Sequence, residues 1–129
     1  MKNQKVKTVF YWIFTSLLSF ELIYGALWDF NILNKGYIYD TLKHLGYPLY
    51  LAIILAVAKI IAFVIIIAPK FVLPKEWAYA GVVILFVGAV CSHISSGDTV
   101  AQYGFPMGFA VITILSYLLR PQGRRLLIT

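Results

Sequence analysis

The chain contains a single cysteine, Cys91, and few acidic residues. Its 129 residues include only five Asp or Glu against 11 Lys or Arg, and charged residues make up 12% of the total. One thiol excludes an intramolecular disulfide, a CxxC redox pair and a metal site built from several cysteines. We interpret Cys91 as a small packing residue. Soluble proteins are about 25% charged, so the scarcity of charge argues against a soluble protein.

Apolar sequence is abundant. Hydrophobic residues make up 61% of the chain, and they gather into four runs at residues 9–30, 47–68, 77–95 and 100–119. At a rise of about 1.5 Å per residue the first two runs are about 33 Å long, enough to cross a hydrocarbon core of about 30 Å, and the other two are near the lower limit. The first run lacks a signal-peptide cleavage pattern, so we expect it to be retained. The sequence predicts an all-α integral membrane four-helix bundle that forms one domain over residues 1–129.

Positive residues are unevenly distributed among the predicted loops. Eight Lys or Arg lie in the amino-terminal segment, the second loop and the carboxyl-terminal tail, whereas the first and third loops hold only Lys35 and Lys43. Positive loops tend to stay in the cytoplasm, so both termini are predicted to be cytoplasmic in a multi-pass protein of the cell membrane. The formal net charge of +6 is then a topology signal with some attraction to anionic lipid. It gives no case for nucleic-acid binding. The lipid bilayer is the expected partner, and a homo-oligomer or other membrane proteins stay open.

Two ionisable residues lie deep inside apolar runs. Glu21 follows the start of the first run by 12 residues, and Lys59 follows the start of the second by 12. A charge at such depth costs roughly 2.5 to 3.5 kcal/mol on insertion scales, so it is kept where it has a partner or a role. One interpretation is a buried salt bridge between Glu21 and Lys59 that fixes the helix register. The other is that the pair lines a ligand or proton site.

The spacing of residues around these two positions predicts which helix faces point inward. Glu21, Tyr24 and Trp28 share one face of the first helix, because residues at i, i+3 and i+7 align. Ala56 and Lys59 share a face of small residues on the second helix. Small residues let helices approach closely, so we expect both faces to point into the bundle.

Further polar residues are expected near the outer end of the bundle. His93 and Asp98 lie at the end of the third run, close to the predicted level of Tyr24. We therefore predict a ligand-binding polar core that begins at Lys59 and opens outward through Glu21, Tyr24, His93 and Asp98. These side chains offer too few ligands for a metal site, and none is predicted.

Prolines and one long connection mark the ends of the predicted helices. Pro48 begins the second helix and Pro69 ends it, because proline fits the first turn of a helix and disrupts its interior. Pro74 and Glu76 open the third, where a carboxylate favours the positive end of the helix dipole. Residues 31–46 are read as the longest connection, either a functional loop or a lid packed on the bundle.

Several short segments resemble the DoxX-like family of small four-helix membrane proteins, over nearly the whole chain. The most specific segment combines charge, aromatic residues and glycine in one short run that contains Glu76, Trp77 and Gly81. The segments are Leu45-Gly-Tyr-Pro-Leu-Tyr-Leu, which contains Pro48, Lys75-Glu-Trp-Ala-Tyr-Ala-Gly81, Ser92-His93 with Gly97-Asp98, and Ser116-Tyr-Leu-Leu-Arg-Pro121.

The resemblance implies a four-helix bundle in the bacterial inner membrane, with relatives that include a membrane subunit of a thiosulfate:quinone oxidoreductase. It supplies no catalytic residue. Glu21, Lys59, Glu76, Trp77, His93 and Asp98 match only as recurrent positions of the family pattern.

Three functions are weighed. The leading hypothesis is an accessory or ligand-binding membrane component that holds a lipid-like or quinone-like molecule beside Glu21 and Lys59. The second is an enzyme, the membrane subunit of a quinone-linked oxidoreductase, in which Lys59 stabilises a quinone anion and Glu21 or His93 handles protons. The third is a small proton-coupled exporter. It is disfavoured here because Lys59 is expected to neutralise Glu21 permanently, and because the loop charges bias the chain to one orientation, unlike dual-topology carriers.

Overall fold

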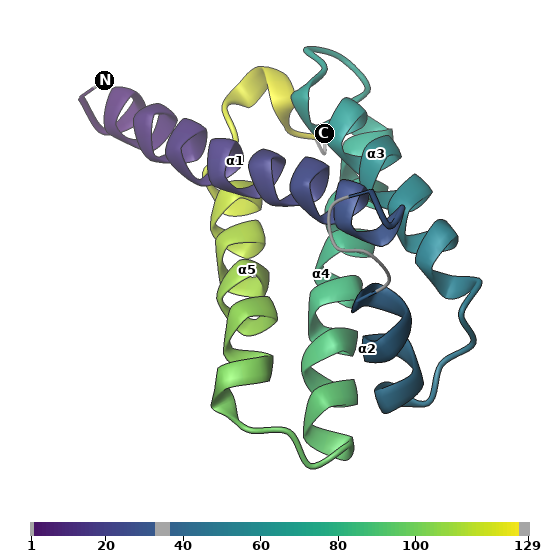
Figure 1. Cartoon of the computed structure of the whole chain (residues 1–129). Helices are drawn as coiled ribbons and strands as arrows, with labels where there is room; N and C mark the ends of the chain where they lie inside the picture. Colours follow the sequence, from purple (N-terminus) through teal and green to yellow (C-terminus); the bar gives the residue numbers. More distant parts are fainter. Residues whose placement is uncertain (1, 33–36, 127–129) are drawn as a thin grey trace.

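The structure is a computed structural model that describes residues 2–32 and 37–126. All regular structure in these ranges is helical, which confirms the predicted all-α class. Figure 1 shows the elements in chain order. They are α1 (Lys2–Asp29), α2 (Tyr37–Leu45), α3 (Leu51–Ile67), α4 (Val72–Ser95), α5 (Val100–Leu118) and a short 3₁₀ helix, η1 (Gln122–Arg124).

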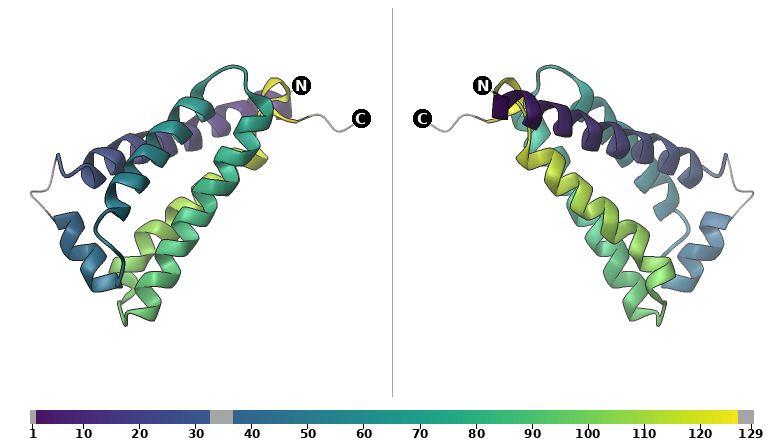
Figure 2. Two further views of the ribbon diagram at one scale, coloured as in Figure 1. Left: turned by 90° about the vertical axis from the view of Figure 1, so that its right-hand side faces the viewer. Right: turned by 90° about the vertical axis from the view of Figure 1, so that its left-hand side faces the viewer.

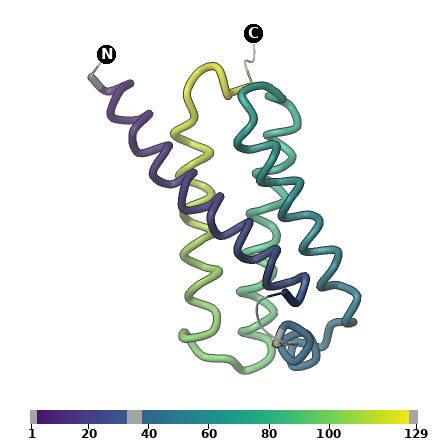
Figure 3. The backbone as a smooth tube through the Cα atoms, turned by 45° about the horizontal axis from the view of Figure 1, so that its top comes forward, coloured from purple at the N-terminus to yellow at the C-terminus, as the bar shows by residue number. Residues whose placement is uncertain are grey.

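The helices form two layers that diverge toward one end. Helix α1 packs against α3 and α5, and α4 packs against α5 and α3. Side views show α1 with α3 as one arm and α4 with α5 as the other (Figure 2). The arms meet at the closed end, where the start of α1, the α3–α4 turn and η1 lie. They separate at the open end, where α2 lies close to the α4–α5 turn (Figures 2 and 3).

Residues 31–46, predicted to be a connection between helices, contain helix α2. Ile38 and Leu42 are one helical turn apart, and both are buried with Ala52 of α3. The rest of α2 is mostly polar, so the helix raises no signal in a hydropathy search, yet Ile38 and Leu42 share one face at helical spacing. This packing agrees with the alternative prediction that residues 31–46 form a lid on the bundle.

Three helices of the described ranges are long and apolar enough to cross a membrane: α1 over Asn3–Asp29, α4 and α5. Helix α3 is even more apolar but has 17 residues, fewer than the predicted 47–68. It begins late because Gly46 has a positive φ of 84° and residues 47–50 form a turn around Pro48. Helix α4 begins earlier than predicted, with Pro74 in its first turn, where the missing N–H has no helical partner to lose.

The core between the arms combines apolar packing with a few buried hydroxyls. Leu18, Leu22 and Phe86 are almost completely buried in the main cluster. Beside them the Ser116 hydroxyl lies 2.6 Å from Thr15 Oγ1 and 2.8 Å from Tyr79 Oη; these residues come from α5, α1 and α4. Hydrogen bonds between helices of this kind are a common way to fix membrane-helix packing.

Basic side chains close the end of α3. The Lys75 side chain is fully buried and donates to the carbonyls of Ile65, Ala68 and Lys70. Arg124 donates to the carbonyls of Ile66 and Ile67 at the same helix end and shares the Ala68 carbonyl with Lys75. The last carbonyls of a helix lack partners within it, so these side chains satisfy them and join α3 to α4 and η1.

Candidate functional site

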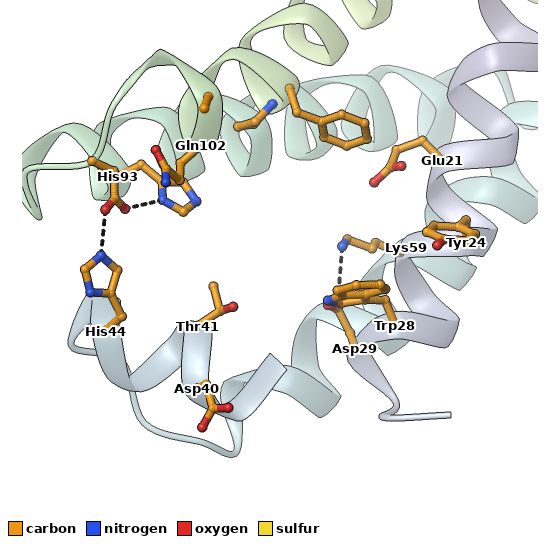
Figure 4. A pocket seen from close by; sticks show the side chains of 15 residues that line it. Glu21, Tyr24, Trp28, Asp29, Asp40, Thr41, His44, Lys59, His93 and Gln102 are labelled. Atoms are coloured by element: carbon orange, nitrogen blue, oxygen red, sulfur yellow. Dashed lines mark hydrogen bonds and ion pairs between the residues drawn. The ribbon is translucent and has the colours of Figure 1, made fainter. Parts of the chain in front are cut away.

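A cavity of about 800 Å³ lies between the two arms at the open end. All five residues predicted to form a ligand site line it: Glu21, Tyr24, Lys59, His93 and Asp98. Their depth and helix faces in the sequence predicted that they lie together. Figure 4 shows Glu21, Tyr24 and Lys59 at one side of the cavity and His93 across from them. Their role in binding stays a prediction, but they share one space.

The Lys59 ammonium pairs with Asp29 rather than with Glu21. Its Nζ lies 2.7 Å from Asp29 Oδ2, and the two side chains are 10% and 4% exposed. Within the described part of the chain no ion pair joins Lys59 to Glu21. The expected salt bridge between Glu21 and Lys59 is therefore wrong. Asp29 ends α1 on the same face as Glu21, two turns farther toward the open end, and it takes the closer position.

Glu21 nevertheless remains near Lys59 because Gly25 lets the two side chains approach. A Cβ on Gly25 would lie 2.9 Å from Lys59 Nζ and 3.0 Å from Glu21 Oε1. The carboxylate and the ammonium are thus separated by the space of one missing methyl group. Glu21 is 7% exposed, and its carboxylate points into the cavity (Figure 4). Two carboxylates and one ammonium therefore occupy this part of the site.

Asp98 joins two histidines at the rim of the cavity. His44 Nε2 donates to Asp98 Oδ1 at 2.7 Å, and His93 Nδ1 donates to Asp98 Oδ2 at 2.6 Å. The hydrogen bond from His93, and next that from His44, hold the pKa of the Asp98 carboxyl below its ordinary value of 3.8. Because His44 belongs to α2 and Asp98 to the α4–α5 turn, this rim cluster connects α2 to the second arm (Figure 4).

Sequence reasoning missed several residues that complete the cavity. Asp40, Thr41 and His44 come from α2, and Gln102 and Phe105 come from α5. The α2 residues were assigned to a loop, so no face was predicted for them. The α5 residues follow one another at i and i+3, a helical spacing that was present in the sequence but carried no ionisable group.

A second, apolar groove of about 380 Å³ runs between α3 and α4. Trp77, one of the recurrent positions named above, and Gly81 of the same family-like segment line it together with Lys59. Trp77 is 72% exposed. Glu76 points elsewhere, with its Oε1 3.1 Å from Arg120 Nη1 at the closed end. Lys59 therefore separates the polar cavity from an apolar groove on the outside of the bundle.

The described ranges contain no group of three or more His, Cys, Asp or Glu arranged to hold a metal ion. The ionisable groups of the cavity are instead distributed between the Lys59–Asp29 pair, Glu21 and the rim cluster. The site is organised around hydrogen bonds and charge pairing.

The sequence pattern of the DoxX-like family matches residues 13–116. This range is most of the chain. The chain belongs to the DoxX-like family. Comparisons with curated proteins and with solved structures found no match. The family match contains the whole lining of the cavity but excludes Arg120 and Arg124 of the closed end. This DoxX-like chain is therefore a membrane protein whose cavity lies within the region that defines the family.

Proposed function

We propose that this DoxX-like protein is a ligand-binding or accessory component of the cell membrane that holds a small amphiphilic molecule in the cavity of the open end. The observation that carries the proposal is Glu21, which is 7% exposed and forms no ion pair with another residue of the described ranges, beside a paired Lys59 in a cavity of about 800 Å³. Ligand pockets commonly measure about 300 to 1,000 Å³ and combine apolar walls with a few polar groups.

The proposed topology has α1, α3, α4 and α5 spanning the membrane and both termini in the cytoplasm. The closed end holds the positive residues of the amino-terminal segment, the α3–α4 turn and η1, as expected for a cytoplasmic surface. Helix α3 alone is about 25 Å long at 1.5 Å per residue, so the turn at residues 47–50 completes its crossing. The cavity then faces the outer side of a bacterial inner membrane.

Native mass spectrometry tests the proposal. The protein purified from its own membranes is compared with a Glu21→Gln variant and with a Glu76→Gln control, whose carboxylate lies at the closed end beside Arg120. We expect a discrete bound mass in the wild type and the control that is lost in Glu21→Gln. A bare protein in all three samples would contradict ligand binding and would favour a scaffolding role.

A small proton-coupled exporter is the second candidate. One of the two arguments against it required Lys59 to neutralise Glu21, and Lys59 instead pairs with Asp29. This pairing leaves Glu21 available for exchange between a proton and a cation. Proton-driven uptake of a cation into vesicles, abolished by Glu21→Gln, would support this candidate, and uptake unchanged by that substitution would exclude it.

The quinone-linked alternative gains less from the geometry. A quinone anion needs a positive group at its oxygen, and Lys59, the only lysine of the described cavity lining, already contacts Asp29. Quinone reduction in membranes with and without the protein tests this alternative directly. Equal rates would remove it.

A further inference from the structure

The ionisable residues of the cavity do not balance in charge. Four carboxylates face one ammonium and two imidazoles among the described lining residues. These groups are Glu21, Asp29, Asp40, Asp98, Lys59, His44 and His93. With neutral imidazoles, the lining carries an excess of negative charge.

Most of these groups are already engaged or lie at the surface. Lys59 pairs with Asp29. Asp98 accepts hydrogen bonds from both histidines, and Asp40 lies on the exposed side of α2. Glu21 differs from all of them, because it is buried, has no hydrogen bond or ion pair to another described residue, and points into the cavity (Figure 4).

A single buried carboxylate in an apolar bundle is rarely left charged without a counterion. Either it keeps a proton, or a cation balances it. An anionic ligand would add a second negative charge to the same space. A neutral ligand would leave the imbalance unchanged. The charge of the site therefore selects for a cation.

The walls around Glu21 suit an organic cation better than a hydrated metal ion. Tyr24 and Trp28 of α1 and Phe105 of α5 line the same cavity. Aromatic faces attract ammonium groups and also accept apolar substituents. No cluster in the described ranges offers the oxygen ligands that a divalent metal requires.

We propose that the cavity binds one organic ammonium cation, which replaces a proton on the Glu21 carboxyl. The O–H bond of the protonated carboxyl breaks, the proton leaves to water, and the cation takes the charge-balancing position. No other bond forms or breaks. The inference rests on the proposed ligand-binding function and adds the chemical class of the ligand.

The charged and titratable neighbours of Glu21 come from every element around the cavity. They are Tyr24 and Asp29 of α1, Asp40 and His44 of α2, Lys59 of α3, His93 of α4 and Asp98 of the α4–α5 turn, while α5 contributes only uncharged residues to the lining. Among these, Lys59 lies near Glu21 but is held by Asp29. The rim histidines face Asp98. Proton release at Glu21 is therefore expected to dominate the coupling to ligand binding.

Isothermal titration of the full-length protein in detergent tests the proposal with three probes of similar shape. These are benzyltrimethylammonium, its neutral carbon analogue neopentylbenzene, and the anion phenylacetate. Titrations in two buffers of different ionisation enthalpy count the protons released. We expect the cation alone to bind, with release of up to one proton. Its apparent affinity should rise by about tenfold per pH unit while Glu21 is protonated in the free protein, the slope for one exchanged proton.

Glu21→Gln and Glu76→Gln form a matched pair of variants. Both remove one carboxylate, but Glu76 lies at the closed end in contact with Arg120. We expect Glu21→Gln to abolish proton release and weaken cation binding at least about tenfold, roughly the effect of losing one charge-assisted contact, while Glu76→Gln keeps both. Cation binding without proton release in the wild type would overturn the exchange at Glu21.

The probes separate failure of this inference from failure of the proposed function. Binding of neopentylbenzene or phenylacetate instead of the ammonium would overturn the cation class but keep the ligand cavity. Absence of binding by all three probes, together with a bare protein in native mass spectrometry, would contradict both. The comparison among probes uses the wild type alone, so it stands even if Glu21→Gln fails to fold.

Discussion

Replacement of Lys59 by methionine is the sharpest test of the charge arrangement in the cavity. Among the described residues, the lysine contributes the only ammonium of the cavity lining, 2.7 Å from Asp29 and separated from Glu21 by the space at Gly25. With Glu21 carrying a proton in the free protein, Lys59→Met leaves the buried Asp29 carboxylate without its counterion. Removing one partner of a buried pair typically costs about 3 to 5 kcal/mol, because the other charge is left without compensation.

The protein has one way to reduce that cost, which is to protonate Asp29. For an ordinary aspartate with a reference pKa of about 3.9, protonation at about pH 7 costs roughly 4 kcal/mol. The cost of removing the partner of a buried charge and the cost of protonating Asp29 thus have the same magnitude. We expect Lys59→Met to lose roughly 4 kcal/mol of unfolding free energy at about pH 7, a large part of the 5 to 15 kcal/mol of a typical domain. At about pH 5 the protonation cost falls to roughly 1.5 kcal/mol, so most of the loss should be recovered.

Two companion variants distinguish charge compensation from simple packing. Asp29→Asn leaves Lys59 beside Glu21, which can release its proton and compensate the ammonium, so the loss should be no more than about 1 to 2 kcal/mol. Glu21→Gln leaves the Lys59–Asp29 pair intact and replaces only a protonated carboxyl. Its stability should be unchanged or higher. The expected order of destabilisation is Lys59→Met, then Asp29→Asn, then Glu21→Gln.

Unfolding in mixed micelles with increasing dodecyl sulfate, followed by circular dichroism, measures these differences. Lys70→Met serves as control, because it also replaces lysine by methionine but at an exposed turn. A loss in Asp29→Asn as large as that in Lys59→Met would refute the reasoning, since Glu21 would then be unable to act as second partner. A pH-independent loss in Lys59→Met would refute it equally.

Three further substitutions test separate parts of the structure. Gly25→Ala should keep or raise the melting temperature, since alanine favours a helix over glycine by about 1 kcal/mol. The same substitution should weaken benzyltrimethylammonium binding in titration, because the added Cβ would lie within 3.0 Å of both the Lys59 and the Glu21 side chains. Lys75→Met removes the fully buried donor to three carbonyls at the end of α3. It should lower the free energy of unfolding by roughly 2 to 3 kcal/mol in the same micelle titration. A smaller loss than in Lys70→Met would contradict this role. Asp98→Asn leaves one rim histidine without an acceptor and should speed hydrogen exchange in α2. In the wild type, folding lowers the pKa of Asp98. The ionised carboxylate therefore stabilises the fold fully at pH values above its ordinary pKa of 3.8, and this stabilisation is lost as the pH falls through the lowered pKa of the folded protein. Hydrogen exchange in α2 should rise in that acid range.

Much of the site could be predicted because depth and helix face are both encoded locally. The positions of Glu21 and Lys59 within their apolar runs placed them at similar depth, and the spacing to Tyr24 put one face inward. His93 and Asp98 followed from their place at the end of a run. All five line the same cavity. Residue counting suffices for such predictions, because helix rise and periodicity are nearly constant.

The choice of partner for Lys59 could not be predicted in the same way. Asp29 and Glu21 lie on one face of α1, and both are within the reach of a lysine side chain from α3. Which carboxylate is closer depends on how α3 crosses α1, and Gly25 permits the close approach. Helix α2 was missed for a different reason. Its buried face consists mainly of Ile38 and Leu42, too little apolar sequence to stand out beside runs of about 20 residues.

The shape of the molecule bears on the choice between a binding protein and an exporter. An exporter must open its site alternately to both sides, whereas a binding protein needs one opening. The described lining of the cavity includes no residue of the closed end. At that end Lys75 and Arg124 hold the last carbonyls of α3, which joins α3 to α4 and η1. Opening that end would break several hydrogen bonds from charged donors, each worth about 1.5 to 3 kcal/mol. A one-sided cavity with an exchangeable proton therefore fits a receptor or accessory protein for cationic amphiphiles better than a carrier.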